Sequence, residues 1–342
     1  YYKEAVKLAK AHEVPIILDP VGCHSGAYRL SVVLDLIKTG AISLLRGNQS
    51  EIKAIYDALN TNHKIDSSLS GKGVDGEQVE DSAIITYRLA RQINCPVVAT
   101  GEEDYVSDGT RVFAVPHGHS IMTAVTGTGC LLGAVLAAFF SSYYPFMDNL
   151  SIGEFLAYAL AYYGLAGESA VKVSGVKPGI FSVAFMDALY EFDDAMLLSK
   201  NRIRPVVVPD QLKVYFISGT QDVGFNERHL LDTVEAACRG GVTCFQFREK
   251  GTVTLEGQQK LELAQQLKEI CAMYNVLYII NDDVDLAVAV NADGIHVGQE
   301  DMRLEDVRNL VGNKVVGISI HSLEELHKTD VVYADCVGVG PM

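Results

Sequence analysis

A glycine-rich turn stands immediately before a long apolar stretch in the first half of the chain. The turn is Thr126–Cys130, with the sequence TGTGC, and LLGAVLAAFF follows it. Glycines let the backbone approach a phosphate closely, and a helix N-terminus supplies unpaired amides and a partial positive charge. Cys130 could then act as a base or polar anchor for a hydroxyl that attacks a γ-phosphate. The alternative is a tight turn whose cysteine is a small buried residue.

Polar residues also follow two apolar runs upstream of this turn. Asp19 ends the run IILDP, and Arg46, Asn48 and Glu51 occur in RGNQSE, after the run ISLL. Asn48 and Glu51 are three residues apart, so they share one face of a helix that opens there. Such a pair could organise Mg²⁺ and water near a triphosphate.

In the second half, a strand-like run ends in the charged sequence QFREK. Side chains alternate along a strand, so Gln246, Arg248 and Lys250 share one face. Phe247 and Glu249 then point the other way. Arginine with lysine suits a diphosphate, because one binds through two hydrogen bonds and the other acts as a point charge. The alternative is a solvated run of charges.

The next three strand-like runs also end in polar residues, namely Asn281 with Asp282 and Asp283, then Asp301, then Ser319. Magnesium favours few carboxylates plus phosphate oxygens, so Asp282 and Asp301 could hold Mg²⁺ with a substrate diphosphate. The alternative is that Asp282 and Asp283 only cap a helix. In a (β/α) barrel the active residues lie at the carboxyl ends of strands, and four consecutive strand ends favour the functional interpretation.

These residues lie in two parts of the chain that differ in their pattern of predicted strands and helices. Residues 1–198 alternate short Val/Ile/Leu runs with helical patterns, which is typical of buried parallel strands, and become mainly helical after the glycine turn. The polar, proline-bearing residues 199–211 predict a linker. Residues 212–342 read as six strands alternating with five helices, which predicts a parallel sheet or a (β/α) barrel, and the barrel would have fewer than the eight units of a complete one. Ser322 and Glu325 predict a capping box on the last helix.

The sequence begins in a helical pattern and ends in a strand-like one, so we expect a chain cut at both ends. Its 342 residues predict about two domains, and 49% hydrophobic with 21% charged residues exclude a disordered chain. The net charge of −15 argues against nucleic-acid binding. The longest apolar stretch is shorter than the ~20 residues of a membrane span.

Cysteine and histidine usage gives no metal or redox motif. The seven cysteines are scattered, without a CxxC pair, and predict free thiols in a reducing cytoplasm. His117 and His119 could suggest a metal pair, but no third ligand accompanies them in the sequence. We interpret them as loop residues.

The motifs QFREK, IINDDVDLAVAVNADGIHVGQEDM, GIS with HS, and GPM resemble thiamine-phosphate synthases over residues 212–342. This resemblance implies a TIM barrel, Mg²⁺ at Asp282 and Asp301, and catalysis by Arg248 and Lys250 through stabilisation of the departing diphosphate. The pyrimidine carbocation left behind would be captured by the thiazole nitrogen. The residues implied to bind hydroxymethylpyrimidine diphosphate, with Glu249 counted among them, are Gln246, Arg248, Glu249, Lys250, Asn281 and Ser319.

The motifs LDPVG, RGNQSEI, TGEEDYVSDG and HGHSIMTAVTGTGCL resemble hydroxyethylthiazole kinases, which have a ribokinase-like fold, from residue 1 to about residue 195. The resemblance implies a thiazole contact at Gly127, a catalytic Cys130 near the transferred phosphate, and a homo-oligomer. Relatives of ribokinase usually have aspartate where Cys130 stands. The residues expected to bind Mg²⁺ in this half are Asp19 and Glu51. Those expected to bind ATP are Arg46, Thr100, Thr126, Gly127 and Gly129.

Together these resemblances predict two consecutive reactions of thiamine biosynthesis. The expected partners are hydroxyethylthiazole, ATP, hydroxymethylpyrimidine diphosphate and thiazole phosphate, with neither nucleic acid nor membrane. One alternative is a kinase for another vitamin precursor fused to the synthase. Another is a truncated chain that binds nucleotides or diphosphates without turnover, and we hypothesise that this chain is poorly active while a longer parent is active.

Overall fold

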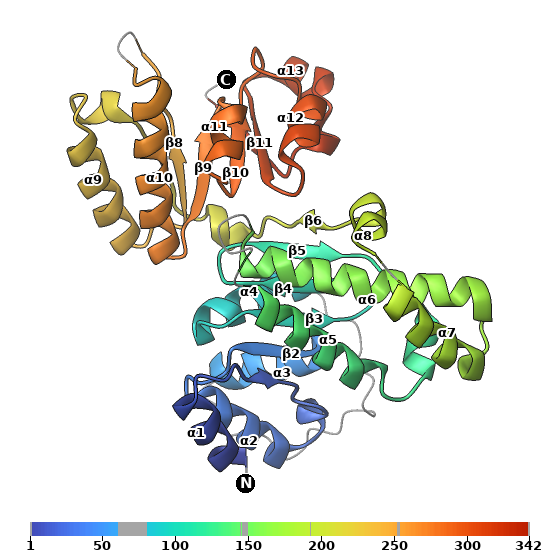
Figure 1. Ribbon diagram of the computed structural model, residues 1–342. Coiled ribbons are helices and arrows are strands. Elements are labelled where there is room, and N and C mark those ends of the chain that lie inside the picture. Colours follow the sequence, from blue (N-terminus) through green and yellow to red (C-terminus); the bar gives the residue numbers. More distant parts are fainter. Residues whose placement is uncertain are drawn as a thin grey trace. The chain divides into compact units, whose positions relative to one another are not determined.

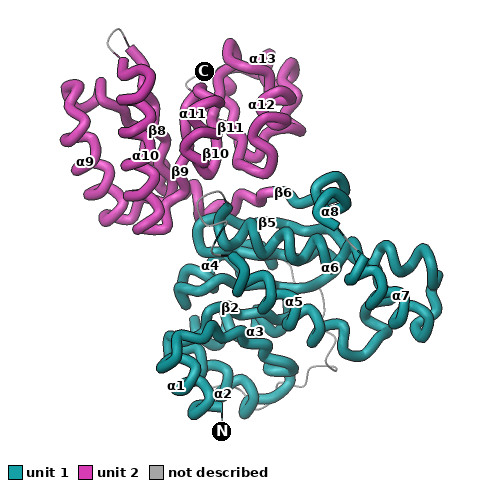
Figure 2. Tube along the Cα trace, viewed as in Figure 1, with its two compact units in different colours: residues 1–204 teal, residues 205–342 magenta. Residues whose placement is uncertain are grey.

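The computed structural model describes residues 2–60, 81–143, 145, 150–191, 193–251 and 254–340. The chain divides into unit 1, Tyr1–Arg204, and unit 2, Pro205–Met342 (Figure 2). This division falls inside the segment 199–211 that the sequence predicts as a linker. Residues 341 and 342, the end of the GPM motif, lie outside the described residues.

Unit 1 contains a six-stranded sheet in the part of the chain that the structure describes, in the order β1-β2-β3-β4-β5-β6. Strands β1, β2 and β3 are parallel, whereas β4 is antiparallel to β3 and to β5. Strands β3, β4 and β5 therefore form two consecutive hairpins. The strands are β1 (Ile17–Leu18), β2 (Leu44–Asn48), β3 (Val97–Thr100), β4 (Asp104–Ser107), β5 (Val112–Val115) and β6 (Arg204–Pro205).

Helices cover both faces of this sheet (Figure 1). Leu44 and Val98 pack with α5, α6 and α7, and their neighbours Leu45 and Val97 pack with α2, α3 and α4. Successive side chains of a strand point to opposite faces, so continuous apolar runs suit this three-layer arrangement. The helices are α1 (Tyr2–Ala11), α2 (Ala27–Ile37), α3 (Gln49–Asn60), α4 (Ser82–Ile93), α5 (Thr128–Ser142), α6 (Ile152–Ser174), α7 (Pro178–Glu191) and α8 (Asp194–Lys200), with 3-10 turns η1 (Cys23–Ser25) and η2 (Ser120–Ala124).

Unit 2 alternates strands and helices around a curled sheet, ordered β12-β11-β10-β9-β8-β7 and parallel throughout the described residues. The predicted half-barrel, with six strands and five helices, is confirmed. The strands are β7 (Tyr215–Ser218), β8 (Cys244–Phe247), β9 (Leu277–Asn281), β10 (Gly294–Val297), β11 (Val315–Ile320) and β12 (Cys336–Val339). The helices are α9 (Glu227–Arg239), α10 (Gly257–Met273), α11 (Val284–Ala289), α12 (Leu304–Val311) and α13 (Leu323–Lys328), with 3-10 turns η4 (Pro209–Leu212), η5 (Thr220–Val223) and η6 (Val331–Tyr333).

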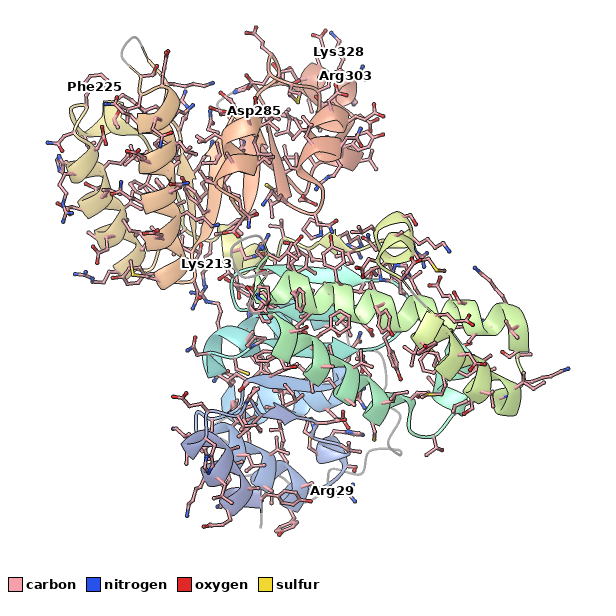
Figure 3. The ribbon with its side chains drawn as sticks, viewed as in Figure 1. Arg29, Lys213, Phe225, Asp285, Arg303 and Lys328 are labelled. Carbon is pink, nitrogen blue, oxygen red and sulfur yellow. The ribbon has the colours of Figure 1, made fainter. Side chains whose placement is uncertain are left out.

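The two faces of the curled sheet carry different side chains. Phe247 and Tyr278 belong to the large core beneath the helices, whereas Leu277, Ile279 and Val315 form a smaller apolar cluster on the inner face. Charged side chains lie outside, and Figure 3 labels Lys213, Asp285, Arg303 and Lys328 among them. The inner cluster thus forms a floor, and the polar residues of the same face lie nearer the carboxyl ends of the strands.

The predicted capping box on α13 forms only in part. Ser322 Oγ accepts the Glu325 N–H at 3.1 Å, as expected. The Glu325 carboxylate, however, accepts the N–H of His321 at 2.7 Å, one residue before the cap. Of the helices that the structure describes, none combines the length and apolar character needed to cross a membrane.

Candidate active sites

In unit 1, an arginine of β2 reaches the start of α5. Arg46 Nη1 donates to Asp19 Oδ2 at 2.8 Å, and Nη2 donates to Thr100 Oγ1 at 3.5 Å. A Cβ placed on Gly129 would lie 3.4 Å from Arg46 Nη2, and one on Gly133 would lie 4.0 Å from Asp19 Oδ2. Arg46 therefore links Asp19 after β1 and Thr100 at the end of β3 to the N-terminal part of α5.

The glycine turn before α5 exposes its backbone. Gly127 is the N-cap residue with φ 98°, a conformation that glycine adopts without the strain of a side chain. Thr128 Oγ1 fixes the turn by donating to the Met122 carbonyl at 2.8 Å. Thr126, Gly127 and Cys130 are exposed, so the helix N-terminus faces solvent beside the Arg46 guanidinium. This arrangement suits an anion.

Asn48 and Glu51 form a reciprocal pair at the start of α3. Asn48 Oδ1 accepts the Glu51 N–H, and Glu51 Oε2 accepts the Asn48 N–H, both at 2.8 Å. Glu51 Oε1 accepts the Gly22 N–H at 2.7 Å. Burial raises the pKa of Glu51, and these two amides oppose the rise. Both carboxylate oxygens thus hold backbone in place, and a role for Glu51 near Mg²⁺ stays a prediction.

Two residues near Arg46 were not among those singled out from the sequence. Tyr163 donates its hydroxyl to the Thr128 carbonyl at 2.5 Å, and burial raises its pKa. Asp104 accepts the Gly101 N–H at 2.9 Å, and burial raises its pKa to about 7 although Gly101 and Arg46 oppose the rise. Tyr163 comes from the middle of an apolar helix, where no local sequence signal marks it.

The two histidines that precede η2 bind protein atoms. His117 Nδ1 lies 3.0 Å from Glu168 Oε1, and its Nε2 accepts the Arg202 N–H at 2.9 Å. His119 Nδ1 accepts the Ile121 N–H at 3.2 Å, which makes it the N-cap of η2. Each histidine therefore hydrogen-bonds to other residues of unit 1, in line with their interpretation as loop residues.

In unit 2, polar side chains from five neighbouring strands line the inner face. Tyr215 donates to Gln246 Oε1 at 2.9 Å, and Gln246 Nε2 donates to Asn281 Oδ1. His296 Nε2 lies 2.8 Å from Ser319 Oγ, and its Nδ1 is buried without a hydrogen-bond partner among the described residues. Of these, Tyr215 and His296 were missed from the sequence. Following the inner face of each strand at period two would have found both.

An acidic pair with one lysine stands at the ends of β8 and β9 and after β10. Lys250 Nζ forms an ion pair with Asp282 Oδ2, and Asp301 Oδ2 accepts the Gly298 N–H at 2.6 Å. Burial and the neighbouring Asp301 raise the pKa of Asp282, against the effect of Lys250. Burial also acts to raise the pKa of Asp301, but the Gly298 amide and the hydrogen bond to Asp282 outweigh it and lower that pKa. A cation that contacts both carboxyls would therefore be bound favourably at this position.

Arg248 and Glu249 differ in their surroundings. Arg248 has an exposed side chain, and its backbone is fixed because its N–H donates to the Ser218 carbonyl at 3.0 Å. Glu249 Oε2 accepts the Thr220 N–H at 3.0 Å, and its Oε1 accepts the Thr220 hydroxyl. The Glu249 carboxylate therefore fixes the first residue of η5, and its role in substrate binding stays a prediction.

Among the described residues, no three or more histidine, cysteine, aspartate or glutamate side chains are grouped so as to hold a metal ion. Magnesium sites in enzymes of phosphate substrates use one or two carboxylates and complete their ligands with phosphate oxygens and water. A magnesium site in either unit would therefore need only one or two protein carboxylates.

Comparison with known proteins agrees with this division of chemistry. The model of the "Hydroxyethylthiazole kinase family" matches residues 1–195, and that of "Thiamine monophosphate synthase" matches residues 214–342. The chain is 33% identical to the thiamine biosynthesis bifunctional protein ThiM/ThiE of Symbiobacterium thermophilum, over 99% of this chain and 68% of that protein.

Two further relatives each match one unit. A hydroxyethylthiazole kinase of Streptococcus agalactiae is 42% identical over 58% of this chain and 73% of its own length. Thiamine-phosphate synthase 1 of Streptococcus pneumoniae is 51% identical over 38% of this chain and 62% of its own length. The chain thus spans 62% to 73% of the lengths of these three relatives. Residues 1–195 belong to the hydroxyethylthiazole kinase family and residues 214–342 to the thiamine monophosphate synthase family, and the chain as a whole belongs to the bifunctional proteins of thiamine biosynthesis that join the two.

Proposed function

We propose that unit 1 transfers the γ-phosphoryl group of ATP to the hydroxyl of hydroxyethylthiazole, and that unit 2 joins the resulting thiazole phosphate to hydroxymethylpyrimidine diphosphate. The products of the second reaction are thiamine monophosphate and diphosphate. The observation that supports the first reaction best is the convergence of Asp19, Arg46 and Thr100 on the exposed glycine turn. Family membership of both units supports the pair of reactions.

In unit 1, the amides of the glycine turn and the Arg46 guanidinium would hold the transferred phosphoryl group. At the transition state the negative charge is spread over the three equatorial oxygens of that group and over the leaving group, so donors fixed beforehand stabilise it. Cys130, exposed in the first turn of α5, stands where it can orient the attacking hydroxyl. Tyr163 holds the Thr128 carbonyl and so fixes the backbone beneath Cys130.

The residues of unit 1 fit a magnesium ion through Asp19 better than through Glu51. Asp19 Oδ1 is buried without a hydrogen-bond partner among the described residues, and Asp19 Oδ2 is 2.8 Å from Arg46. Both Glu51 oxygens accept backbone N–H groups, so Glu51 would act through water. Mg²⁺ bound there would neutralise charge on the ATP phosphates.

In unit 2, Arg248 and Lys250 would bind the departing diphosphate, as a forked donor and a point charge. Gln246, held between Tyr215 and Asn281, would bind the pyrimidine on the inner face. Ser319 with His296 completes that face on the side of β11. The protein would stabilise the leaving diphosphate electrostatically, and no strong base is needed.

The pairing of Asp282 with Asp301 fits a magnesium ion in unit 2. Asp301 raises the pKa of Asp282 while Asp282 lowers that of Asp301, and Lys250 is the cation paired with Asp282. Two like charges in contact repel each other unless a proton or a cation lies between them. Mg²⁺ bound by Asp282 and Asp301 would neutralise charge on the diphosphate as it leaves.

An exposed apolar stripe on α7 supports assembly into a homo-oligomer. Ile180, Val183 and Tyr190 are 50%, 65% and 92% exposed, and they recur at helical spacing on α7. Contiguous apolar surface of this kind marks interaction sites on soluble domains. Sedimentation of the chain would measure its oligomeric state.

A single mass-spectrometric assay tests both reactions. The mixture contains hydroxyethylthiazole, ATP, Mg²⁺ and hydroxymethylpyrimidine diphosphate, and the wild type in a form that spans the whole length of its bifunctional relative is expected to form thiamine monophosphate. Cys130→Ala should slow the appearance of thiazole phosphate alone. Asp282→Ala should let thiazole phosphate accumulate. Absence of both products with the wild type would contradict the proposal, and phosphorylation of a different vitamin alcohol would redirect it to another kinase substrate.

A further inference from the structure

The short segment 201–204 lies between the ranges matched by the two families, yet it is built into unit 1. Residue Arg204 begins β6, which pairs with β5 as the sixth strand of the sheet (Figure 1). Ile203 is 5% exposed and belongs to the core that contains Phe113 and Leu160. The segment is thus an ordered part of the kinase fold.

Two arginines of this segment bind different parts of unit 1. Arg202 Nη2 donates to the Pro116 carbonyl at 2.8 Å and to Glu168 Oε1 at 3.0 Å. Arg204 Nη2 lies 2.8 Å from both carboxylate oxygens of Glu103. The two anchors are two residues apart in sequence, but they hold separate regions.

Glu103 belongs to residues 101–103, which we name the β3–β4 loop and which directly follows Thr100. Its carboxylate also accepts the Tyr105 hydroxyl at 2.6 Å, and its carbonyl accepts Gln49 Nε2 at 3.0 Å. Gln49 packs so closely on Gly101 that a Cβ there would lie 2.4 Å from Gln49 Nε2. The loop is therefore tied to the first residue of α3, next to the Asn48–Glu51 pair.

We infer that Arg204 is a positioning residue for nucleotide binding by unit 1. It holds the Glu103 carboxylate, Glu103 holds the β3–β4 loop against Gln49, and the loop continues the strand that ends in Thr100. Segment 201–204, which follows the residues matched by the kinase family, thereby contributes to ATP binding. The inference rests on the proposed function of unit 1.

The strength of this effect is limited by exposure. The Arg204 and Glu103 side chains are 54% and 23% exposed, and ion pairs at such positions contribute little through charge alone. The larger contribution is geometric, because the pair fixes one end of a loop whose other end carries Thr100. Loss of Arg204 should therefore weaken ATP binding by about threefold to fivefold.

The test compares Arg204→Gln with Arg202→Gln in the full chain. ATP binding is measured by calorimetric titration, and thermal unfolding is measured on the same samples. Arg202→Gln removes the other anchor of the segment and should leave the ATP dissociation constant unchanged. Arg204→Gln should raise it about threefold to fivefold. The charge-exchanged variant Glu103→Arg with Arg204→Glu should recover most of the ATP affinity that is lost in Arg204→Gln. A role of the ion pair in stability alone predicts no change of ATP affinity in either variant.

Hydrogen exchange at the Gly101 amide measures independently how firmly the β3–β4 loop is held. The Arg204→Lys variant is measured as well, in case Arg204→Gln unfolds. Exchange should be faster in both Arg204 variants and unchanged in Arg202→Gln. Equal ATP affinity in wild type and Arg204→Gln, or equal loss in both arginine variants, would overturn the inference. A wild type that binds no ATP would instead overturn the proposed kinase function, so the two failures are distinguishable.

Discussion

Gly129 and Arg46 lie against each other, because a Cβ on Gly129 would stand 3.4 Å from Arg46 Nη2. The absence of a side chain at this position lets the guanidinium reach the N-terminus of α5. The strand β2 and the helix α5 thus contribute one site although about eighty residues separate them in the sequence.

Alanine at the two glycines of the turn should have different effects. Gly129→Ala places a methyl group beside Arg46, so we expect a several-fold weaker ATP affinity with little change in stability. Gly127→Ala meets no atom within 4 Å, but its φ of 98° strains any residue with a side chain, so we expect about 1–2 kcal/mol of lost stability. Calorimetric ATP titration and urea unfolding separate the two effects. Equal losses of affinity without loss of stability in Gly127→Ala would contradict this account.

The lysine at the end of β8 should matter for the synthase reaction more than a similar lysine nearby. Lys250 pairs with Asp282, and Lys260 pairs with Asp283, the N-cap of α11. Only the first pair lies with Asp301 at the proposed diphosphate site. Lys250→Gln should reduce the rate of thiamine monophosphate formation by about a hundredfold, because a fixed donor to the leaving group is lost.

Lys260→Gln serves as the matched control for that experiment. It removes a partly buried ion pair of the same kind and should lower the free energy of unfolding by about 1 kcal/mol while the rate stays near that of the wild type. The comparison uses single-turnover assays with preformed thiazole phosphate. Similar rate losses in the two variants would show that the diphosphate is bound elsewhere.

Much of the fold was predictable from the sequence because the local signals agree with the tertiary structure. Continuous Val/Ile/Leu runs predict strands buried on both faces, and Leu44 with Leu45 shows why, since each packs into a different core. The strand ends of unit 2 were predictable for the same reason. Gln246 and Asn281 share the inner face that the two-residue period assigns them.

The remaining features depend on contacts that no local pattern contains. Arg204 meets Glu103 across about a hundred residues, and the polar segment around Arg204 reads as a linker although it adds a strand. Tyr163 stands in an apolar helix, and its hydroxyl finds the Thr128 carbonyl only in the folded chain. Glu51 looks like a free carboxylate in sequence, whereas two backbone amides occupy it.

The stability of unit 1 should fall as the pH is lowered below about 6.5. Burial lowers the pKa of His117, with Glu168 opposing and Arg202 adding to the shift. The unfolded chain therefore binds a proton at a higher pH than the folded chain, so stability is present above the unfolded pKa and is lost as the pH falls through that window. The Arg202 N–H already occupies Nε2, so protonation also breaks that hydrogen bond.

Urea unfolding at pH 7.5 and pH 5.5 measures this effect. For wild type the free energy of unfolding should be lower at pH 5.5 than at pH 7.5. His117→Gln does not titrate, so its free energy of unfolding should fall less than that of the wild type over the same range. Parallel pH profiles for the two proteins would assign the dependence to other groups.

Glu249 should prove to be a structural residue of unit 2. Its carboxylate accepts both the N–H and the hydroxyl of Thr220, a residue only 2% exposed. Glu249→Ala leaves the Thr220 amide without its acceptor, which should cost about 2 kcal/mol of unfolding free energy. A double-mutant cycle with Thr220→Val should give a coupling of about 1 kcal/mol, since the two residues share one set of bonds. The KM for hydroxymethylpyrimidine diphosphate should stay within about twofold of the wild type, because the carboxylate is already engaged by the N–H and the hydroxyl of Thr220. A large rise in that KM, with stability unchanged, would instead place Glu249 among the residues that bind the substrate.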